Sequence, residues 1–279
     1  MSLTVPYRVG DIDVTILTDG TMSFDPETFP GTDPSRIAAL LAEAGEDSIR
    51  TNFNAVLVHT AGKLVLVDAG PRDLFGPTAG NLPAGLREAG VDPEEVEVLY
   101  FTHLHPDHIA GAIDAEGRAI FPNAEVVMLE AERAFWSDDA NFSGADDTLR
   151  AWMQLARGVL AAYGERLRPI SGAAEVAPGM TALPLPGHTP GHAGFRLASG
   201  DAQFAHVGDI VHAPFLQVPD PEISVAFDAD ADAARAARKR LLAEVAADGI
   251  AFTGGHLLRP AVVRARADGA GYRLETLAN

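Results

Sequence analysis

Three histidines and one aspartate fall within the segment Thr102–His108, directly after a run of apolar residues that is typical of a buried strand. Side chains alternate along a strand, so His103 and His105 lie on the same side of the chain. A proline then starts a turn, which can bring Asp107 and His108 to a second point close by. Few structural roles require so many imidazoles in one place. The spacing therefore predicts two adjacent metal ions.

The amino-acid composition limits which metal this site can hold. The chain has no Cys, which excludes thiolate ligands, a cysteine nucleophile and disulfides, but it has nine His. Imidazole and carboxylate together are typical zinc ligands, whereas Ca²⁺ and Mg²⁺ prefer a shell of oxygen atoms. We expect two divalent ions, with zinc as the first choice and Mn, Fe or Co as alternatives.

The charge balance limits the partners. The 279 residues include 39 Asp+Glu against 21 Lys+Arg, a net charge of −18, which disfavours binding to nucleic acid or to an anionic membrane surface. The first residues lack the pattern of a signal peptide, and no apolar run approaches the ~20 residues that cross a bilayer. We expect a cytoplasmic protein that acts on a small molecule; a homodimer is left open.

Strand and helix patterns alternate without an obvious linker. We expect strands at Asp13–Thr18, Phe53–His59, Lys63–Asp68, Val96–Thr102, Glu125–Leu129, Thr181–Leu185, Gly194–Ala198, Gln203–Val207, Ile250–Thr253, Ala261–Ala267 and Tyr272–Leu277. We expect helices at Asn81–Ala89, Glu130–Trp136, Asp146–Tyr163 and Ala231–Ala247. Residues 25–50, 136–147 and 212–228 are expected to be loops over the metal site. Residues 1–279 are predicted to form one α/β domain.

Three further polar residues follow apolar strands and have glycine beside them: His188 in Pro-Gly-His-Thr-Pro-Gly-His, Asp209 in Val-Gly-Asp and His256 in Gly-Gly-His. With the first segment they complete the pattern His-x-His-x-Asp-His, then His, Asp and His. In this pattern the sequence resembles the metallo-β-lactamase superfamily. The resemblance implies an αββα sandwich, with two mixed sheets inside and helices on the outer faces.

The resemblance also implies a role for each residue of the pattern. The implied ligands are His103, His105 and His188 for one ion, Asp107, His108 and His256 for the other, and Asp209 bridging both. Asp68, in Leu-Val-Asp-Ala-Gly, matches a carboxylate that orients the metal-binding loop without binding an ion. Two close divalent ions can activate a shared water as a bridging hydroxide near pH 7, which predicts metal-assisted hydrolysis, with Asp107 or Asp209 orienting the hydroxide and passing a proton to the leaving group.

Within the superfamily the chain looks most like the methyl parathion hydrolase family, and next like lactonases that act on acyl-homoserine lactones. The segments that carry this likeness are Lys63–Gly70, Leu74–Thr78, Phe101–Gly111, Gly187–His192 and Gly271–Arg273. It implies substrates that are small neutral esters, lactones or organophosphate triesters. It also implies pocket residues: Phe75, Trp136, Trp152, His212, Phe215 and Phe227. His212 stands where the lactonases carry a Tyr that touches the substrate carbonyl.

Two other activities of the same fold remain open. A thioester hydrolase of the glyoxalase II kind would need a cationic patch for glutathione, and no such patch is evident in the sequence. An iron-dependent enzyme of the persulfide dioxygenase kind would be separated by metal analysis. Outside the pattern, His59 and His206 are expected to be structural, and His192 is expected to brace a loop. The acidic run Asp228–Asp232 is expected to cap a helix and to face solvent.

Overall fold

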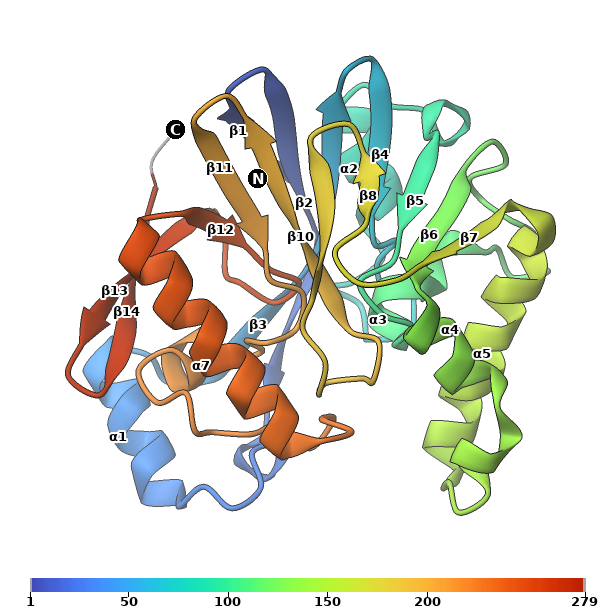
Figure 1. Cartoon of the computed structure of the whole chain (residues 1–279). Coiled ribbons are helices and arrows are strands. Elements are labelled where there is room, and N and C mark those ends of the chain that lie inside the picture. Colours follow the sequence, from blue (N-terminus) through green and yellow to red (C-terminus); the bar gives the residue numbers. More distant parts are fainter. Residues whose placement is uncertain (1, 278–279) are drawn as a thin grey trace.

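Two seven-stranded sheets form the centre of the computed structural model, which describes residues 2–277 (Figure 1). The first sheet contains, in spatial order, β1 (Thr4–Val9), β2 (Ile12–Phe24), β3 (Ile49–Thr60), β4 (Lys63–Val67), β5 (Val98–Tyr100), β6 (Glu125–Leu129) and β7 (Leu167–Ile170). The second contains β14 (Gly271–Thr276), β13 (Val263–Asp268), β12 (Ala251–Thr253), β11 (Ala202–His206), β10 (Ala193–Ser199), β9 (Met180–Pro184) and β8 (Glu175–Ala177).

The inner strands are apolar throughout because both of their faces are buried. In β4, Val65 and Val67 point into the core between the two sheets, where they join Phe195 and Phe204 of the second sheet. Leu66, between them, points into a second core beneath the helices. Alternation along one strand thus supplies two cores, which explains why the sequence shows a continuous apolar run rather than an alternating one.

Helices cover the outer face of each sheet. The helices of the described residues are α1 (Pro34–Ala44), α2 (Leu82–Glu88), α3 (Pro106–Ile109), α4 (Glu130–Ser137), α5 (Asp147–Tyr163), α6 (Pro214–Gln217) and α7 (Ala231–Asp248). Of these, α2, α4 and α5 pack on the first sheet, α7 packs on the second, and α1 packs against α6. Short 3₁₀ turns occur at Pro26–Thr28, Pro93–Glu95, Ala110–Ala112, Asp139–Phe142 and Gly164–Arg166. Figure 1 shows α7 on one side of the molecule and α4 with α5 on the other. The expected αββα sandwich, with two mixed sheets, is confirmed.

The main departure from the expected elements is α1, which lies within the segment 25–50 that we expected to be a loop. Asp33 caps this helix by accepting a hydrogen bond from the backbone N–H of Ser35 at 2.8 Å, and Pro34 follows the cap. Ile37 and Leu40 are buried in a third apolar cluster. A capping aspartate, a proline and this apolar spacing were a helix signal in the sequence. β1, β7 and β8 were also not expected.

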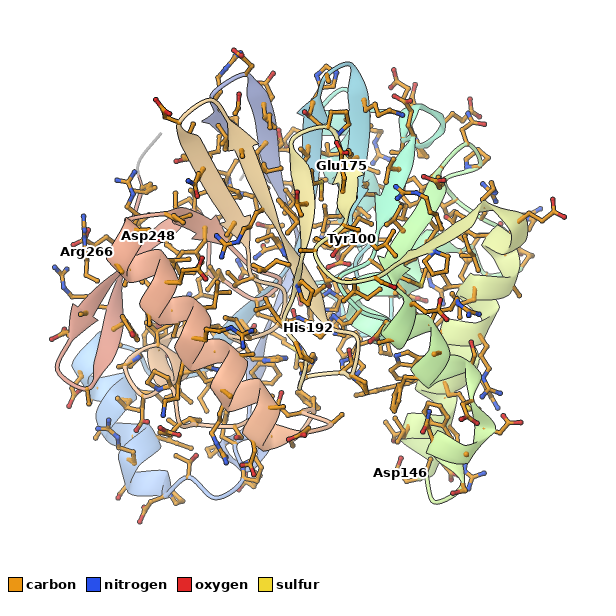
Figure 2. All side chains as sticks on the ribbon, viewed as in Figure 1. Tyr100, Asp146, Glu175, His192, Asp248 and Arg266 are labelled. Carbon is orange, nitrogen blue, oxygen red and sulfur yellow. The ribbon has the colours of Figure 1, made fainter. Side chains whose placement is uncertain are left out.

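The strand order brings the ends of several strands to one edge of the sandwich. β4, β5 and β6 run parallel to one another, and β11 runs parallel to β12, so the carboxyl ends of neighbouring strands meet. Figure 2 shows His192 at the lower end of the strands, below Tyr100. The polar segments after β4, β5, β11 and β12 all emerge at this edge. Among the helices of residues 2–277, none has the length and apolar character that crossing a bilayer requires.

Candidate active site

His103, His105 and His188 form the first group of possible metal ligands. His103 and His105 follow β5, and His188 follows β9, so two sheets contribute to the group. Nδ1 of His105 lies 3.1 Å from Nε2 of His103 and 2.9 Å from Nε2 of His188. Three ring nitrogens that are this close leave room for one shared cation.

Asp107, His108, Asp209 and His256 form the second group. Oδ2 of Asp209 lies 3.1 Å from Nε2 of His108 and 2.9 Å from Nε2 of His256. The same oxygen lies 3.7 Å from Nε2 of His103 and 3.6 Å from Nε2 of His188, which belong to the first group. Oδ2 of Asp209 therefore lies between the two groups.

One atom tests whether this cluster fits metal ions. Asp209 is 1% exposed, and its Oδ1 has no hydrogen-bond partner among the described residues. A buried carboxylate oxygen without a partner is costly, and a cation is the group that would satisfy it among so many imidazoles. The donor set of imidazole and carboxylate fits Zn²⁺ and similar divalent ions.

The two groups differ in their electrostatics. Burial lowers the pKa of His103, His105 and His188 well below the ordinary value, so these imidazoles are neutral and their lone pairs are available. For His108, burial also opposes protonation, but the carboxylates of Asp209, Asp107 and Asp68 outweigh it and raise the pKa. The second group thus attracts positive charge more strongly than the first.

Hydrogen bonds on the far side of each ring fix its direction. Nδ1 of His108 donates to Oδ2 of Asp68 at 2.8 Å, and Nδ1 of His256 donates to the carbonyl of Asn52 at 2.8 Å. Each bond leaves Nε2 facing the cluster. Asp68 also accepts from the backbone N–H of Thr102 at 2.9 Å, so it orients the loop and is not part of either ligand group.

Two glycines allow the backbone to approach the cluster closely. A Cβ on Gly255 would lie 2.4 Å from Oδ1 of Asp209, and Gly208 has φ of +53° beside the ring of His192. Nε2 of His192 accepts a hydrogen bond from the backbone N–H of Asp209 at 2.8 Å, while its Nδ1 donates to the carbonyl of Leu185. His192 therefore braces the Asp209 loop, in keeping with its expected role.

A cavity of about 190 Å³ opens directly onto the cluster. The residues that border it are Met22, Ser23, Phe24, Asp25, Thr28, Phe53, Phe75, His105, Asp107, Trp152, His188, Asp209, His212, Phe227 and His256. Four of the six side chains proposed for the pocket are among them: Phe75, Trp152, His212 and Phe227. Nε2 of His212 lies 3.4 Å from Oδ2 of Asp209, close enough to the cluster to touch a bound substrate.

The other two residues proposed for the pocket lie elsewhere. Trp136 is fully buried in the core beneath the helices, where it stacks on Phe142. Its ring lies edge-on to that of His105, with 5.7 Å between the centroids, but it does not border the cavity. Phe215 borders a different cavity, next to Leu258 and Leu274. Helical periodicity identified the apolar residues but did not show which cavity or core each one faces.

A family model described as the metallo-beta-lactamase superfamily matches residues 51–256. This range contains both ligand groups and runs from β3 to His256. The chain belongs to the metallo-beta-lactamase superfamily. This confirms the superfamily that the sequence pattern resembled.

Two solved structures have nearly the same fold as this chain. The hydrolase AbOPH has a TM-score of 0.93 and 28% identity, over 100% of this chain and 99% of that chain. AidC, a dizinc quorum-quenching lactonase in complex with a product, has a TM-score of 0.92 and 25% identity, over 100% of both chains.

Curated relatives match over shorter stretches. The N-acyl homoserine lactonase AiiB of Agrobacterium fabrum is 31% identical over 125 residues, which are 44% of this chain and 43% of that one. A probable metallo-hydrolase of Mycobacterium bovis is 29% identical over 185 residues, 56% of each chain. The matches thus span about half the length of these relatives.

One buried carboxylate of this superfamily member was missed in the sequence. Glu132, on α4, is 0% exposed and accepts hydrogen bonds from the backbone N–H of Leu104, the indole of Trp136, the hydroxyl of Thr189 and the backbone N–H of Gly191. It thereby ties the loop of His103 and His105 to the loop of His188. The sequence did contain one sign that Glu132 is buried: it lies among the apolar residues on one face of the expected helix Glu130–Trp136.

Proposed function

We propose that this protein is a hydrolase that uses two divalent metal ions to cleave small, neutral esters, lactones or organophosphate triesters. The observation that carries the proposal is the position of Asp209. Its Oδ2 lies within 3.7 Å of ring nitrogens of five histidines: His103, His108, His188, His212 and His256. Membership of the superfamily, and the likeness to a hydrolase and a dizinc lactonase, support the same class of activity.

The chemistry divides between the ions and the side chains. When bound, two divalent ions would supply Lewis acidity and lower the pKa of a water toward about 7. Asp107 borders the cavity with 13% of its side chain exposed, so its carboxylate can hold the attacking water by a hydrogen bond. It can then take the proton of that water and deliver it to the leaving oxygen. Asp209 is proposed to share the orienting role.

His212 is proposed to bind the substrate at the reacting bond. Its ring borders the cavity and stacks on His256, with 4.7 Å between ring centroids. An N–H of this ring can donate a hydrogen bond to the carbonyl or phosphoryl oxygen, which gains negative charge in the transition state. A tyrosine hydroxyl could donate in the same way.

The walls of the cavity favour neutral substrates with an apolar part. Aromatic rings of Phe53, Phe75, Trp152 and Phe227 border it, and none of its described lining residues is Lys or Arg. A glutathione thioester carries carboxylates that would find no cationic partner there, which disfavours the glyoxalase II alternative. Within the superfamily we propose the methyl parathion hydrolase family as the relative, because the resemblance to it implies two metal ions and neutral substrates of this kind.

A substrate screen tests the proposal. Protein loaded with Zn²⁺ or Mn²⁺ is assayed against an aryl ester, acyl-homoserine lactones, a dialkyl aryl phosphate and S-lactoylglutathione, with metal-stripped protein as the control. We expect metal-dependent turnover of at least one neutral substrate, which Asp107→Asn lowers and Asp73→Asn, at an exposed carboxylate, leaves unchanged. Turnover of the thioester alone, or a single bound iron with oxygen consumption, would reject the proposal.

A further inference from the structure

The orientation of His188 depends on a carboxylate outside the ligand groups. Nδ1 of His188 donates to Oδ1 of Asp228 at 3.0 Å, and the Asp228 side chain is 1% exposed. The bond leaves Nε2 of His188 facing His105. The expectation that the run Asp228–Asp232 faces solvent is therefore wrong for Asp228, whereas Asp230 does cap α7 by accepting from the backbone N–H of Ala233.

Behind Asp228 lies a buried arginine. Arg238, on α7, is 0% exposed, and its Nη2 lies 3.9 Å from Oδ2 of Asp228. Burial lowers the pKa of Arg238 to about 10, so the guanidinium remains charged at neutral pH. Burying a cation is costly unless nearby groups compensate for its lost hydration. Asp228 is the carboxylate that supplies the opposite charge here.

The rest of the guanidinium holds a loop. Nε of Arg238 donates to the carbonyl of Ile210, and Nη1 donates to the carbonyls of Pro221 and Ile223 at 3.0 and 2.8 Å. These carbonyls lie at the two ends of the segment 210–223, which includes α6. One planar guanidinium thus clamps the base of the loop that carries His212.

A second buried side chain extends this clamp to His212 itself. Gln217 is 0% exposed; its Nε2 donates to the carbonyl of Ile223 at 3.1 Å, and its Oε1 accepts from the backbone N–H of His212 at 2.7 Å. The carbonyl of Ile223 is shared by Gln217 and Arg238. A continuous polar path therefore runs from His212 through Gln217 and Arg238 to Asp228 and His188.

We infer that Arg238 is a positioning residue with two effects. Through Asp228 it supports the orientation of His188, and through the loop 210–223 it supports the position of His212. The inference rests on the proposed function, in which His188 binds an ion and His212 binds the substrate. Arg238 itself forms no hydrogen bond with either histidine. It holds Asp228 in place behind His188 through their ion pair, and it holds the loop of His212 over the cavity. Metal affinity and substrate affinity then depend on the same buried guanidinium.

Substitutions of Asp228 and of Arg238 are expected to have different effects. Asp228→Asn removes the carboxylate charge behind His188 but leaves the loop bonds of Arg238 in place. It should weaken one of the two metal positions about 10- to 100-fold, the usual effect of losing a group that orients a metal ligand, with little change in KM. Arg238→Met and Arg238→Lys should weaken the same position and also raise KM, because the loop loses its clamp.

The experiment compares these variants with Arg240→Met, which alters an exposed arginine on the same helix. Zn²⁺ affinity is measured by competition with a chromophoric chelator, and the Co²⁺-substituted proteins are compared by visible absorption. Both measurements are made without substrate, so an error in the proposed substrate class does not affect them. KM and kcat are then measured on whichever substrate the screen identifies.

We expect altered cobalt spectra and weaker zinc binding in all three variants at positions 228 and 238. In the double variant Asp228→Asn/Arg238→Met, the loss of zinc affinity should be smaller than the product of the two single losses, because both substitutions act through His188. If the Arg238 variants lower only the melting temperature while zinc affinity and KM equal those of Arg240→Met, Arg238 is merely structural and the inference is wrong. If Arg238→Met does not fold, Arg238→Lys decides by the same criterion. Unchanged zinc affinity and an unchanged cobalt spectrum in Asp228→Asn would also overturn the inference.

Discussion

The indole N–H of Trp136 donates to Oε1 of Glu132 over 2.7 Å, and both side chains are fully buried. The same carboxylate oxygen accepts from the backbone N–H of Leu104, between the two histidines that follow β5. Trp136 therefore supports the candidate site from within the core and does not border the cavity. Trp152 lies on the cavity side, with its ring centroid 5.1 Å from that of His105. The two tryptophans of the chain thus have opposite roles.

Trp136→Leu should lower the free energy of unfolding by about 3–5 kcal/mol, because it leaves a cavity in the core and removes one donor from a buried carboxylate. KM for an aryl substrate should change little in the protein that remains folded. Denaturant unfolding of the metal-saturated protein measures the first quantity. A variant as stable as the parent but with raised KM would show that Trp136 faces the substrate.

Trp152→Leu should raise KM for an aryl substrate about 2- to 10-fold, the value of one aromatic contact of roughly 0.5–1.5 kcal/mol. The ring already borders a void, so the melting temperature should fall much less than in Trp136→Leu. Steady-state kinetics and thermal unfolding on the same preparations separate the two variants. Loss of stability without a change in KM would assign Trp152 to the core.

Asp68→Asn should weaken the metal position that includes His108 about 10- to 100-fold. Asp68 has φ of +59°, a region that Asn tolerates, so the backbone should be kept while the amide replaces an oxygen that accepts from His108 and Thr102. Chelator competition measures the affinity, with Asp73→Asn as the exposed control. Equal affinity in both variants would show that Asp68 has no part in metal binding.

Purified protein should hold two metal ions per chain, and His188→Ala or His256→Ala should each impair one position. Each variant removes one imidazole from a different ligand group. Elemental analysis after dialysis against a weak chelator gives the ratio of metal to protein. A fully occupied single position in the unmodified protein would contradict the bridging place of Asp209.

Part of the stability at low pH should depend on Glu88. Its carboxylate accepts from the backbone N–H of Leu3 at 3.0 Å and from the hydroxyls of Ser2 and Thr4, and these bonds lower its pKa to about 2. Because the pKa is lower in the folded chain than the ordinary value of 4.5, this contribution is complete only above about pH 5 and is lost as the pH falls through 4.5 toward 2. The difference in melting temperature between the parent and Glu88→Gln should therefore shrink over this range. A difference independent of pH would contradict it.

Much of the candidate site could be predicted from local sequence. His103 and His105 share a side because strands alternate, and the remaining members of the pattern follow apolar strands whose ends meet at one edge of a sheet. The role of Asp68 was implied only by the resemblance of its segment to the superfamily. These residues lie in short segments whose geometry depends on neighbouring residues along the chain, so the sequence carries the information directly.

Residues on helices and in long segments were harder to assign. Trp136 and Trp152 both belong to apolar stripes, and Asp228 belongs to an acidic run that resembles a solvated helix start. Periodicity shows that a side chain faces inward, but it does not show what lies opposite. Glu132, one turn before Trp136 on the same helix, meets Leu104 and Thr189, Trp152 borders the cavity, and Asp228 meets His188. The packing of segments far apart in sequence brings these groups together. The ligand types and their spacing were thus present in the chain itself, whereas the pocket walls and the groups behind the ligands arose from contacts between segments far apart in sequence, which local patterns do not encode.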